Sequence, residues 1–156
     1  MGLNEARQVR LARTDDLPAF LTLLAACDVS ACAPSPTEVE RIWHNTMTRD
    51  GLSIFVSQAG EALVATCMLV TAPNLLREGR QHGFLENVAT HPQWQGLGHG
   101  TAVVRAALDA AWAANCHHVL MQSGRADPRV HRFYESLGFV PGLRTAYVAL
   151  GPQSRQ

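Results

Sequence analysis

A turn with glycines at alternate positions is the part of this sequence best suited to chemistry, and its glycines are Gly96, Gly98 and Gly100. The turn lies between a predicted strand, 83–90, and a predicted helix, 98–114. Because glycine has no side chain, a ligand can approach the backbone closely here. The free N–H groups at the helix start and the positive end of the helix dipole favour an anion. The turn therefore predicts a phosphate site, and a diphosphate suits it best.

Two nucleotide sites are excluded by the residues in and around this turn. A dinucleotide-binding turn has the pattern G-x-G-x-x-G and an acidic residue about twenty positions further on. Thr101 stands at the last glycine position, and residues 120–122 offer no acid. A Walker loop needs a lysine, whereas every basic residue of this chain is an arginine. The lack of lysine also excludes Schiff-base chemistry and a lysine nucleophile.

Three motifs follow one another along the chain. The strand before the turn reads E-N-V-A-T-H-P from Glu86, the turn itself reads Q-x-x-G-x-G from Gln95, and F-Y-x-x-x-G-F begins at Phe133. A glycine turn alone is weak evidence, but the three motifs in this order and spacing resemble the GCN5-related N-acetyltransferase (GNAT) family. They are most similar to its bacterial members that act on small molecules. The resemblance is strong over 83–139 and weak before Leu52.

The resemblance implies that acetyl-coenzyme A (acetyl-CoA) donates the acetyl group and that the glycine turn holds its pyrophosphate. The strand that ends at Thr90 would splay from a parallel neighbour, 117–123, and bind the pantetheine arm through its free backbone groups. The amide near Val88 would polarise the acetyl carbonyl. The coenzyme-binding residues expected in this way are Val88, Ala89, Thr90, Gln95, Gly96, Leu97, Gly98, His99, Gly100, Thr101, Asp127 and Phe133.

Two residues are candidates for moving the protons of an acetyl transfer. By resemblance Tyr134 is the general acid, since the tyrosine of this motif points its hydroxyl at the CoA sulfur; a core aromatic beside Phe133 is the alternative. Glu86 is the candidate base, acting directly or through a water. By strand alternation it shares a face with Val88, and it could equally anchor the substrate amine or pair with an arginine.

Other polar residues are expected to have no catalytic role. Asp127 stands where many family members carry an asparagine that contacts the coenzyme, and its negative charge puts that contact in doubt. His99 is expected on the solvent side of the turn, and His131 at the surface. The four cysteines lack zinc-site spacing, and His117 and His118 would face opposite sides of a strand. No metal is expected.

The acceptor side is less well specified than the coenzyme side. In the family the early helices, the loop before the central strand and the last strands shape the acceptor pocket. That nominates Asn74, Leu75, Arg80 and Arg144, together with Arg77 and Tyr147. Arginines there would suit a small amine that carries a carboxylate or phosphate. The E-N-V strand and the turn are also similar to those of glucosamine-6-phosphate N-acetyltransferases, although the coenzyme half says little about the acceptor.

Two other functions stay open at this point. One is acetylation of protein N-termini or lysine side chains, which would favour an open acidic groove; the sequence has no marked acidic cluster on the expected acceptor side. The other is a non-catalytic CoA-binding sensor module. The presence of both Tyr134 and Glu86 argues against that module without excluding it.

The elements that position these residues follow from periodicity and turn signals. The strands are expected at 8–12, 52–58, 61–70, 83–90, 117–123 and 145–150. The helices are expected at 14–25, from Thr37 with a Thr37-x-x-Glu40 capping box, at 98–114 and at 129–137. This order predicts a mixed α/β domain. The resemblance specifies an acyl-CoA N-acyltransferase fold, with a mostly antiparallel sheet, one splayed parallel pair and flanking helices.

Composition agrees with an ordinary globular protein. The 156 residues suit one domain, expected over 1–151 with a loose tail at 152–156. Zero net charge gives no sign of nucleic-acid binding, and no apolar run approaches the roughly 18 residues of a membrane helix. Residues 1–13 have no signal-peptide core, so a cytoplasmic protein is expected. Many family members pair, and the apolar content permits a homodimer without showing an interface.

Overall fold

The computed structural model of the protein describes residues 7–152. By its internal contacts the chain divides into two compact units, 1–121 and 122–156. The first unit holds the sheet and helices α1 to α3, and the second holds helix α4. One domain over 1–151 stays a prediction, and residues 153–156 of the predicted tail lie outside the described residues.

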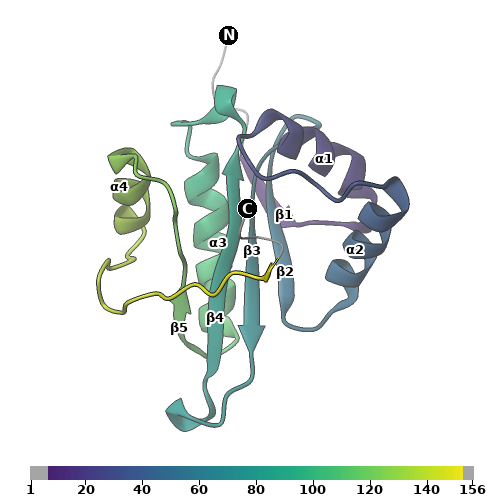
Figure 1. Ribbon diagram of the computed structural model, residues 1–156. Coiled ribbons are helices and arrows are strands. Elements are labelled where there is room, and N and C mark those ends of the chain that lie inside the picture. Colours follow the sequence, from purple (N-terminus) through teal and green to yellow (C-terminus); the bar gives the residue numbers. More distant parts are fainter. Residues whose placement is uncertain (1–6, 153–156) are drawn as a thin grey trace. The chain divides into compact units, whose positions relative to one another are not determined.

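Within residues 7–152, five strands form one mixed sheet and lie side by side in the order of the sequence (Figure 1). These strands are β1 (Gln8–Leu11), β2 (Leu52–Ala59), β3 (Ala62–Ala72), β4 (Gln81–Thr90) and β5 (Cys116–Leu120). Neighbours from β1 to β4 pair antiparallel, whereas β4 and β5 pair parallel. The predicted mixed α/β class with one parallel pair is therefore confirmed.

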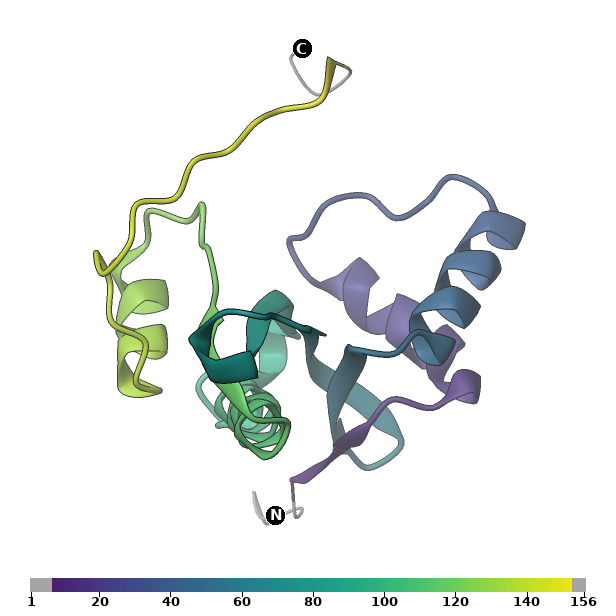
Figure 2. The same ribbon diagram turned by 90° about the horizontal axis from the view of Figure 1, so that it is seen from below.

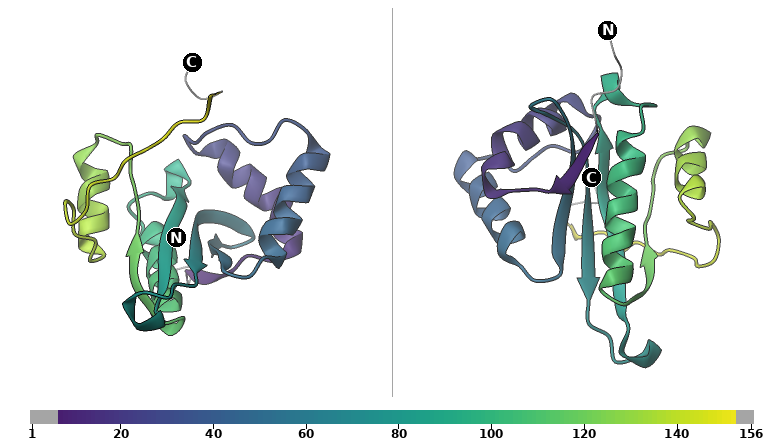
Figure 3. Two further views of the ribbon diagram at one scale, coloured as in Figure 1. Left: turned by 60° about the horizontal axis from the view of Figure 1, so that its bottom comes forward. Right: turned by 180° about the vertical axis from the view of Figure 1, so that it is seen from behind.

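Helices cover both faces of this sheet (Figures 2 and 3). One face carries α1 (Leu17–Ala26) and α2 (Pro36–Thr48), and the other carries α3 (His99–Ala113). Alternation along β2 explains the two layers: Val56 is buried in a cluster with Leu23 of α1 and Trp43 of α2, whereas the next residue, Ser57, contacts His99 of α3. No helix in the described part of the chain is long and apolar enough to cross a lipid bilayer.

The ends of α2 and α3 show how local sequence sets the helices. The capping box predicted at Thr37 is wrong: α2 begins at Pro36, and the hydroxyl of Ser35 accepts a hydrogen bond from the Glu38 N–H at 3.2 Å. Proline favours the first helical position, because its fixed φ suits a helix and its missing N–H would be unpaired there anyway. The stop predicted at Asn115 is confirmed by its left-handed φ of 58°, which ends α3.

A β-bulge interrupts the pairing of β4 with β3. Two residues of β4, Asn87 and Val88, stand opposite the single residue Cys67 of β3. Asn87 has a φ of 52°, a left-handed conformation that asparagine tolerates better than most residues. The extra residue shifts every later side chain by one position, so by register Glu86 shares a face with Ala89. The expectation that Glu86 and Val88 share a face fails for this reason.

The second unit contains α4 (Pro128–Ser136), which closely matches the helix predicted at 129–137. Gly138 follows it with a φ of 93°. The strand predicted at 145–150 does not form, since the structure assigns neither helix nor strand to these residues. Tyr147 is 89% exposed and Val148 is 69% exposed. A strand needs hydrogen bonds to a neighbour as well as suitable side chains, and the sequence pattern reports only the side chains.

Candidate active site

The glycine turn adopts the conformation that its sequence requires. Gly96 has a φ of 75° and Gly98 a φ of 86°, both in the left-handed region that side chains disfavour. Gly98 is the N-cap of α3, and its carbonyl accepts the N–H of Ala102 at 3.0 Å. The N–H groups before Ala102 therefore have no acceptor within the helix. This fifteen-residue helix presents its positive end and free donors at the turn, as an anion site needs.

Arg7 lies against this turn, and sequence reasoning gave it no role. Its guanidinium donates a hydrogen bond from Nη1 to the carbonyl of Leu97 at 3.0 Å. A side chain at Gly98 would collide with the same guanidinium, so the glycine makes room for the arginine. Arg7 is about ninety residues away in sequence, and β1, which follows it, brings it to the turn. The arginine adds a positive charge where the helix already favours an anion.

The turn is tied to the end of β4 by side chains. Gln95 donates a hydrogen bond from its amide to the carbonyl of Thr90 at 3.3 Å. The ring of His91 accepts the N–H of Gln93 at 3.2 Å, which caps a short 3-10 helix, Pro92–Trp94. These bonds fix the spacing between the strand and the turn. The Gln95 side chain is thereby used inside the protein, while the N–H groups at the start of α3 stay available.

His99 is buried beneath the turn, so the expectation that it faces solvent is wrong. It is 4% exposed, its Nδ1 is hydrogen-bonded to the Ser57 hydroxyl at 2.7 Å, and its ring meets Trp94 edge-on at 5.3 Å. Burial lowers the pKa of His99, and the charge of Arg7 lowers it further. The missed signal is periodicity: His99 precedes Val103 by four residues and therefore lies on the buried stripe of α3.

The edge of β4 that faces β5 is paired over only part of its length. The last parallel pair is Phe84 with Leu120, while β4 runs on to Thr90. The predicted residues Val88, Ala89 and Thr90 all lie beyond that last pair. The geometry agrees with the splayed strand that the family resemblance predicts, because the backbone groups on this edge make no ladder to β5.

Glu86 lies on β4 just before the bulge and is exposed to solvent. Among the described residues its carboxylate has no hydrogen-bond or ion-pair partner. Glu86 therefore forms no ion pair with an arginine among the described residues, which was one alternative for its role. A carboxylate with free lone pairs can accept a proton or bind an ammonium group.

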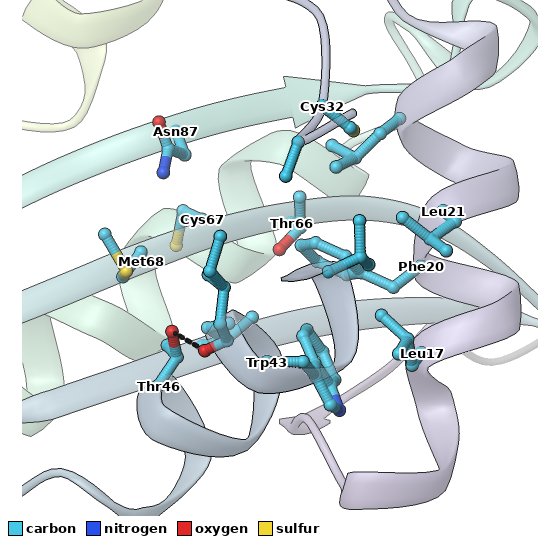
Figure 4. A pocket seen from close by; sticks show the side chains of 15 residues that line it. Leu17, Phe20, Leu21, Cys32, Trp43, Thr46, Thr66, Cys67, Met68 and Asn87 are labelled. Carbon is cyan, nitrogen blue, oxygen red and sulfur yellow. Dashed lines mark hydrogen bonds between the residues drawn. The ribbon is translucent and has the colours of Figure 1, made fainter. Parts of the chain in front are cut away.

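An apolar pocket of about 330 Å³ lies between α1, α2 and the sheet, on the face opposite α3 (Figure 4). Asn87 of the bulge reaches it from β4, and Thr66, Cys67 and Met68 reach it from β3. The remaining lining residues come from α1, α2, β2 and the loop between the two helices, and they are Leu17, Phe20, Leu21, Leu24, Cys32, Ala33, Val39, Ile42, Trp43, Thr46 and Ile54. The sequence reasoning named none of these residues for the acceptor.

The predicted acceptor residues of the first unit do not line this pocket. Asn74 donates a hydrogen bond to the ring of His82 at 3.0 Å, and Leu75 is 98% exposed. Arg80 precedes β4 and donates a hydrogen bond to the carbonyl of Cys116 at 2.9 Å, and its buried Nε has no partner among the described residues. These residues gather at the beginning of β4, whereas Asn87 lies near its end.

The remaining predicted residues belong to the second unit. On α4, the ring of Tyr134 lies 4.9 Å from that of Phe133 and 5.8 Å from that of Phe139. Asp127 is the N-cap of this helix: its carboxylate accepts the N–H of Arg129 at 2.9 Å and pairs with the Arg129 guanidinium at 2.8 Å. These bonds lower the pKa of Asp127 and commit its oxygens to the helix. Arg144 is exposed.

The described part of the chain has no group of three or more histidine, cysteine or acidic side chains placed to hold a metal ion. The four cysteines are all free, and Cys67 and Cys116 are fully buried. Burial raises the pKa of the Cys67 thiol to about 12, and the thiol donates a hydrogen bond to the carbonyl of Val103 at 3.3 Å. Cys67 is therefore a core residue and no nucleophile at neutral pH.

Comparison with known proteins identifies the family. The family model described as the acetyltransferase (GNAT) family matches residues 17–139. This chain belongs to the GNAT family. It is an acetyltransferase, and the match includes the glycine turn, β4 with its bulge and α4.

Individual relatives agree with this assignment. The chain is 28% identical over 134 residues to glucosamine 6-phosphate N-acetyltransferase of Trypanosoma brucei brucei, covering 85% of this chain and 88% of the relative. It is 37% identical to a solved protein of Agrobacterium tumefaciens str. C58 that is provisionally named an acetyltransferase, with a TM-score of 0.84 over 92% of this chain and 99% of that one. Glucosamine-6-phosphate N-acetyltransferase from Arabidopsis thaliana shares the fold, with a TM-score of 0.80 at 19% identity over 95% of this chain and 99% of that one.

Proposed function

We propose that this GNAT acetyltransferase transfers the acetyl group of acetyl-CoA to the primary amine of a small molecule. The observation that carries the proposal is the glycine turn at the start of α3, where left-handed glycines, free helix N–H groups and the Arg7 guanidinium converge. Such a site suits a pyrophosphate. Acetyl-CoA would supply the reactive thioester, and the open edge of β4 beside the turn would hold its pantetheine arm.

The chemistry needs three proton transfers, since two protons leave the nitrogen and one joins the departing thiolate. The lone pair of the neutral amine attacks the thioester carbonyl carbon, a C–N bond forms and the C–S bond breaks, so that an amide, a CoA thiol and one released proton result from an ammonium ion and acetyl-CoA. Glu86 takes the proton from the ammonium group, directly or through a water, or holds that group in place. Tyr134 donates a proton to the departing thiolate, and the second proton of the nitrogen restores the tyrosine hydroxyl. The Val88 N–H polarises the carbonyl.

Direct transfer in a ternary complex is preferred to a route through an acetylated cysteine. Cys67, which lines the apolar pocket, is buried with a pKa of about 12, and so it lacks the thiolate that an acyl acceptor needs. Cys32 is the exposed cysteine of the pocket. Direct transfer predicts that Cys32→Ala still turns over, whereas a route through this thiol predicts that turnover is lost. Free cysteines also suit a reducing compartment, and we place the enzyme in the cytoplasm on that ground.

A small-molecule acceptor is proposed because the named relatives acetylate one. The Trypanosoma brucei brucei and Arabidopsis thaliana proteins are both named for glucosamine 6-phosphate, which carries a primary amine. The test below compares this proposal with two alternatives. One is acetylation of protein N-termini or lysine side chains, and the other is CoA binding without catalysis.

The test is release of the CoA thiol from acetyl-CoA, followed with a thiol reagent and with mass spectrometry of the product. The acceptors are a panel of small amines, an N-terminal peptide and a lysine peptide. The expected result is turnover with at least one small amine that exceeds turnover with both peptides. Preference for a peptide would overturn the acceptor class. Binding of acetyl-CoA without turnover of any amine or peptide would instead identify a sensor module.

A further inference from the structure

The pocket beneath α1 and α2 has a composition that restricts what it can hold. None of the described residues that line it is charged, and most of them are aliphatic or aromatic. We propose that the pocket binds the acceptor and that the acceptor is a primary amine on an apolar aryl or alkyl body, without a phosphate or carboxylate. This inference rests on the proposed acetyl transfer and specifies its substrate class.

The aromatic wall of the pocket presents carbon rather than polar atoms. The rings of Phe20 and Trp43 lie 4.9 Å apart. The indole N–H of Trp43 donates a hydrogen bond to the carbonyl of Thr14 at 2.9 Å, so its polar end is already satisfied. What remains for a ligand is apolar surface, which an aryl or alkyl body can bury favourably.

The hydroxyl groups of the pocket are also satisfied by the protein. Thr46 donates a hydrogen bond to the carbonyl of Ile42 at 2.9 Å, and Thr66 donates one to the carbonyl of Phe55 at 2.9 Å. A phosphate placed here would lose its water without gaining a cation or a free donor from either threonine, which is a costly exchange. Arg80 does not supply a cation for a phosphate in this pocket, because it lies at the other end of β4 and donates a hydrogen bond to the carbonyl of Cys116.

Asn87 supplies the polar group that an amine needs. Its side chain reaches the pocket from the bulge, and its amide has no hydrogen-bond partner among the described residues (Figure 4). The amide oxygen can accept an N–H of the amine while the apolar body occupies the pocket. Asn87 directly follows Glu86 and directly precedes Val88 in β4. An amine held by Asn87 would therefore bind at the stretch of β4 that also carries the residues proposed to take its proton and to polarise the thioester.

The size of the pocket agrees with such a substrate. A volume of about 330 Å³ lies at the lower end of the range of small-molecule sites, about 300–1,000 Å³. The reaction is the balanced transfer described above, with the amine of the apolar body as the attacking nitrogen. Its product is a neutral amide, which the uncharged lining accommodates as well as the substrate.

The test compares binding and turnover of 2-phenylethylamine and tryptamine with those of glucosamine 6-phosphate. Binding is measured by calorimetry on the CoA-saturated protein, and turnover by thiol release from acetyl-CoA. The apolar amines are expected to bind and to exceed glucosamine 6-phosphate in kcat/KM by about tenfold or more. Preference for glucosamine 6-phosphate would overturn the inference and leave the acetyltransferase proposal intact. No binding of acetyl-CoA would defeat the acetyltransferase proposal itself, and the inference with it.

A matched pair of variants assigns the binding to this pocket. Ile42 lines it and Val29 does not, yet both are 43% exposed. Ile42→Gln is expected to raise the KM for 2-phenylethylamine about fivefold at unchanged acetyl-CoA affinity, whereas Val29→Gln leaves both unchanged. A neutral side chain is chosen because a carboxylate would attract the ammonium group. Equal KM values for the two variants would overturn the assignment.

Asn87→Gly tests the polar contact. Glycine adopts the left-handed φ of 52° without steric strain, so the variant keeps the conformation of the bulge and removes the side chain with its amide. The variant is expected to lose about tenfold in kcat/KM for the apolar amines while acetyl-CoA binds as before. Unchanged kcat/KM would remove Asn87 from the acceptor site.

Discussion

The glycine turn and the apolar pocket lie on opposite faces of the same sheet, and they are built from different parts of the chain: one from backbone, the other from side chains. The turn consists of backbone: left-handed glycines and helix N–H groups within a few consecutive residues, with one arginine placed against them. The pocket consists of side chains from two helices, three strands and a loop. A backbone site can serve one coenzyme across a family. A side-chain site can change its acceptor through substitutions that leave the backbone as it was.

The largest effect on turnover is expected at Tyr134, the general acid proposed to protonate the departing thiolate. Tyr134→Phe keeps the ring that meets Phe133 and Phe139 and removes the hydroxyl, so we expect kcat to fall on the order of a hundredfold. Acetyl-CoA affinity and the KM for the amine should stay within a factor of two or so, since the hydroxyl acts on the departing thiolate and the proposed pyrophosphate and acceptor sites keep their residues. Steady-state kinetics with both substrates varied checks this. A kcat close to the wild type would leave Tyr134 as a core aromatic.

The next largest effect is expected on acetyl-CoA affinity when a glycine of the turn is replaced. Gly98→Ala strains a φ of 86° and pushes Arg7 off the Leu97 carbonyl, so the Kd for acetyl-CoA should rise about thirtyfold. Gly96→Ala is the control: its φ is 75°, but the new methyl group meets nothing within 4 Å, and a rise of about tenfold or less is expected. Calorimetry measures both. Equal acetyl-CoA affinities for the two variants would show that the position of Arg7 against the Leu97 carbonyl does not contribute to acetyl-CoA binding.

A smaller effect on acetyl-CoA binding is expected when the positive charge of Arg7 is removed from the turn. Arg7→Gln should weaken acetyl-CoA binding about fivefold at low ionic strength, and the difference should shrink as salt is added, since exposed charges are screened. Binding of an apolar amine to the pocket should not change, because Arg7 does not line it. Titrations at two salt concentrations test this. A loss of amine binding would contradict the separation of the two sites.

The smallest effect concerns the buried pair beneath the turn. Burial lowers the pKa of His99 in the folded protein, so below an ordinary pKa of about 6.5 the unfolded state takes up a proton that the folded state does not. His99 therefore makes stability fall as pH falls through that window, and its full contribution returns above it. The double variant Ser57→Ala with His99→Val removes both partners of the hydrogen bond and should flatten this slope. Urea unfolding across the window, compared with the wild type, is the measurement.

The difference between the two regions also explains what the sequence could predict. The turn, its helix and the E-N-V strand are contiguous, so their residue types and spacing predict these elements closely, while the donor site built on them stays a prediction. Arg7 was missed because β1 brings it to the turn from far away in sequence. Asn87 was missed because a bulge in β4 breaks the alternation on which the placement of Glu86 relied.

Long-range packing accounts for other differences between the sequence predictions and the structure. His99 was expected in solvent because a polar residue in a turn usually is, but a buried hydroxyl on β2 offers it a partner. The acceptor residues predicted around the loop before β4 stay a prediction. The residues of the pocket were not singled out, because apolar side chains look like ordinary core positions in sequence. The last strand was predicted from residue types alone, and no neighbouring strand pairs with residues 145–150.

Thermal unfolding with and without acetyl-CoA, with NAD and ATP as controls, tests whether the glycine turn binds acetyl-CoA. At a hundredfold excess over its Kd, a ligand stabilises the folded state by about 2.7 kcal/mol, a shift of a few degrees in Tm for a chain of this size. The account predicts this shift with acetyl-CoA, none with NAD or ATP, and a clearly smaller one for Gly98→Ala at the same concentration. No shift at saturating acetyl-CoA would contradict the assignment of the glycine turn as the donor site.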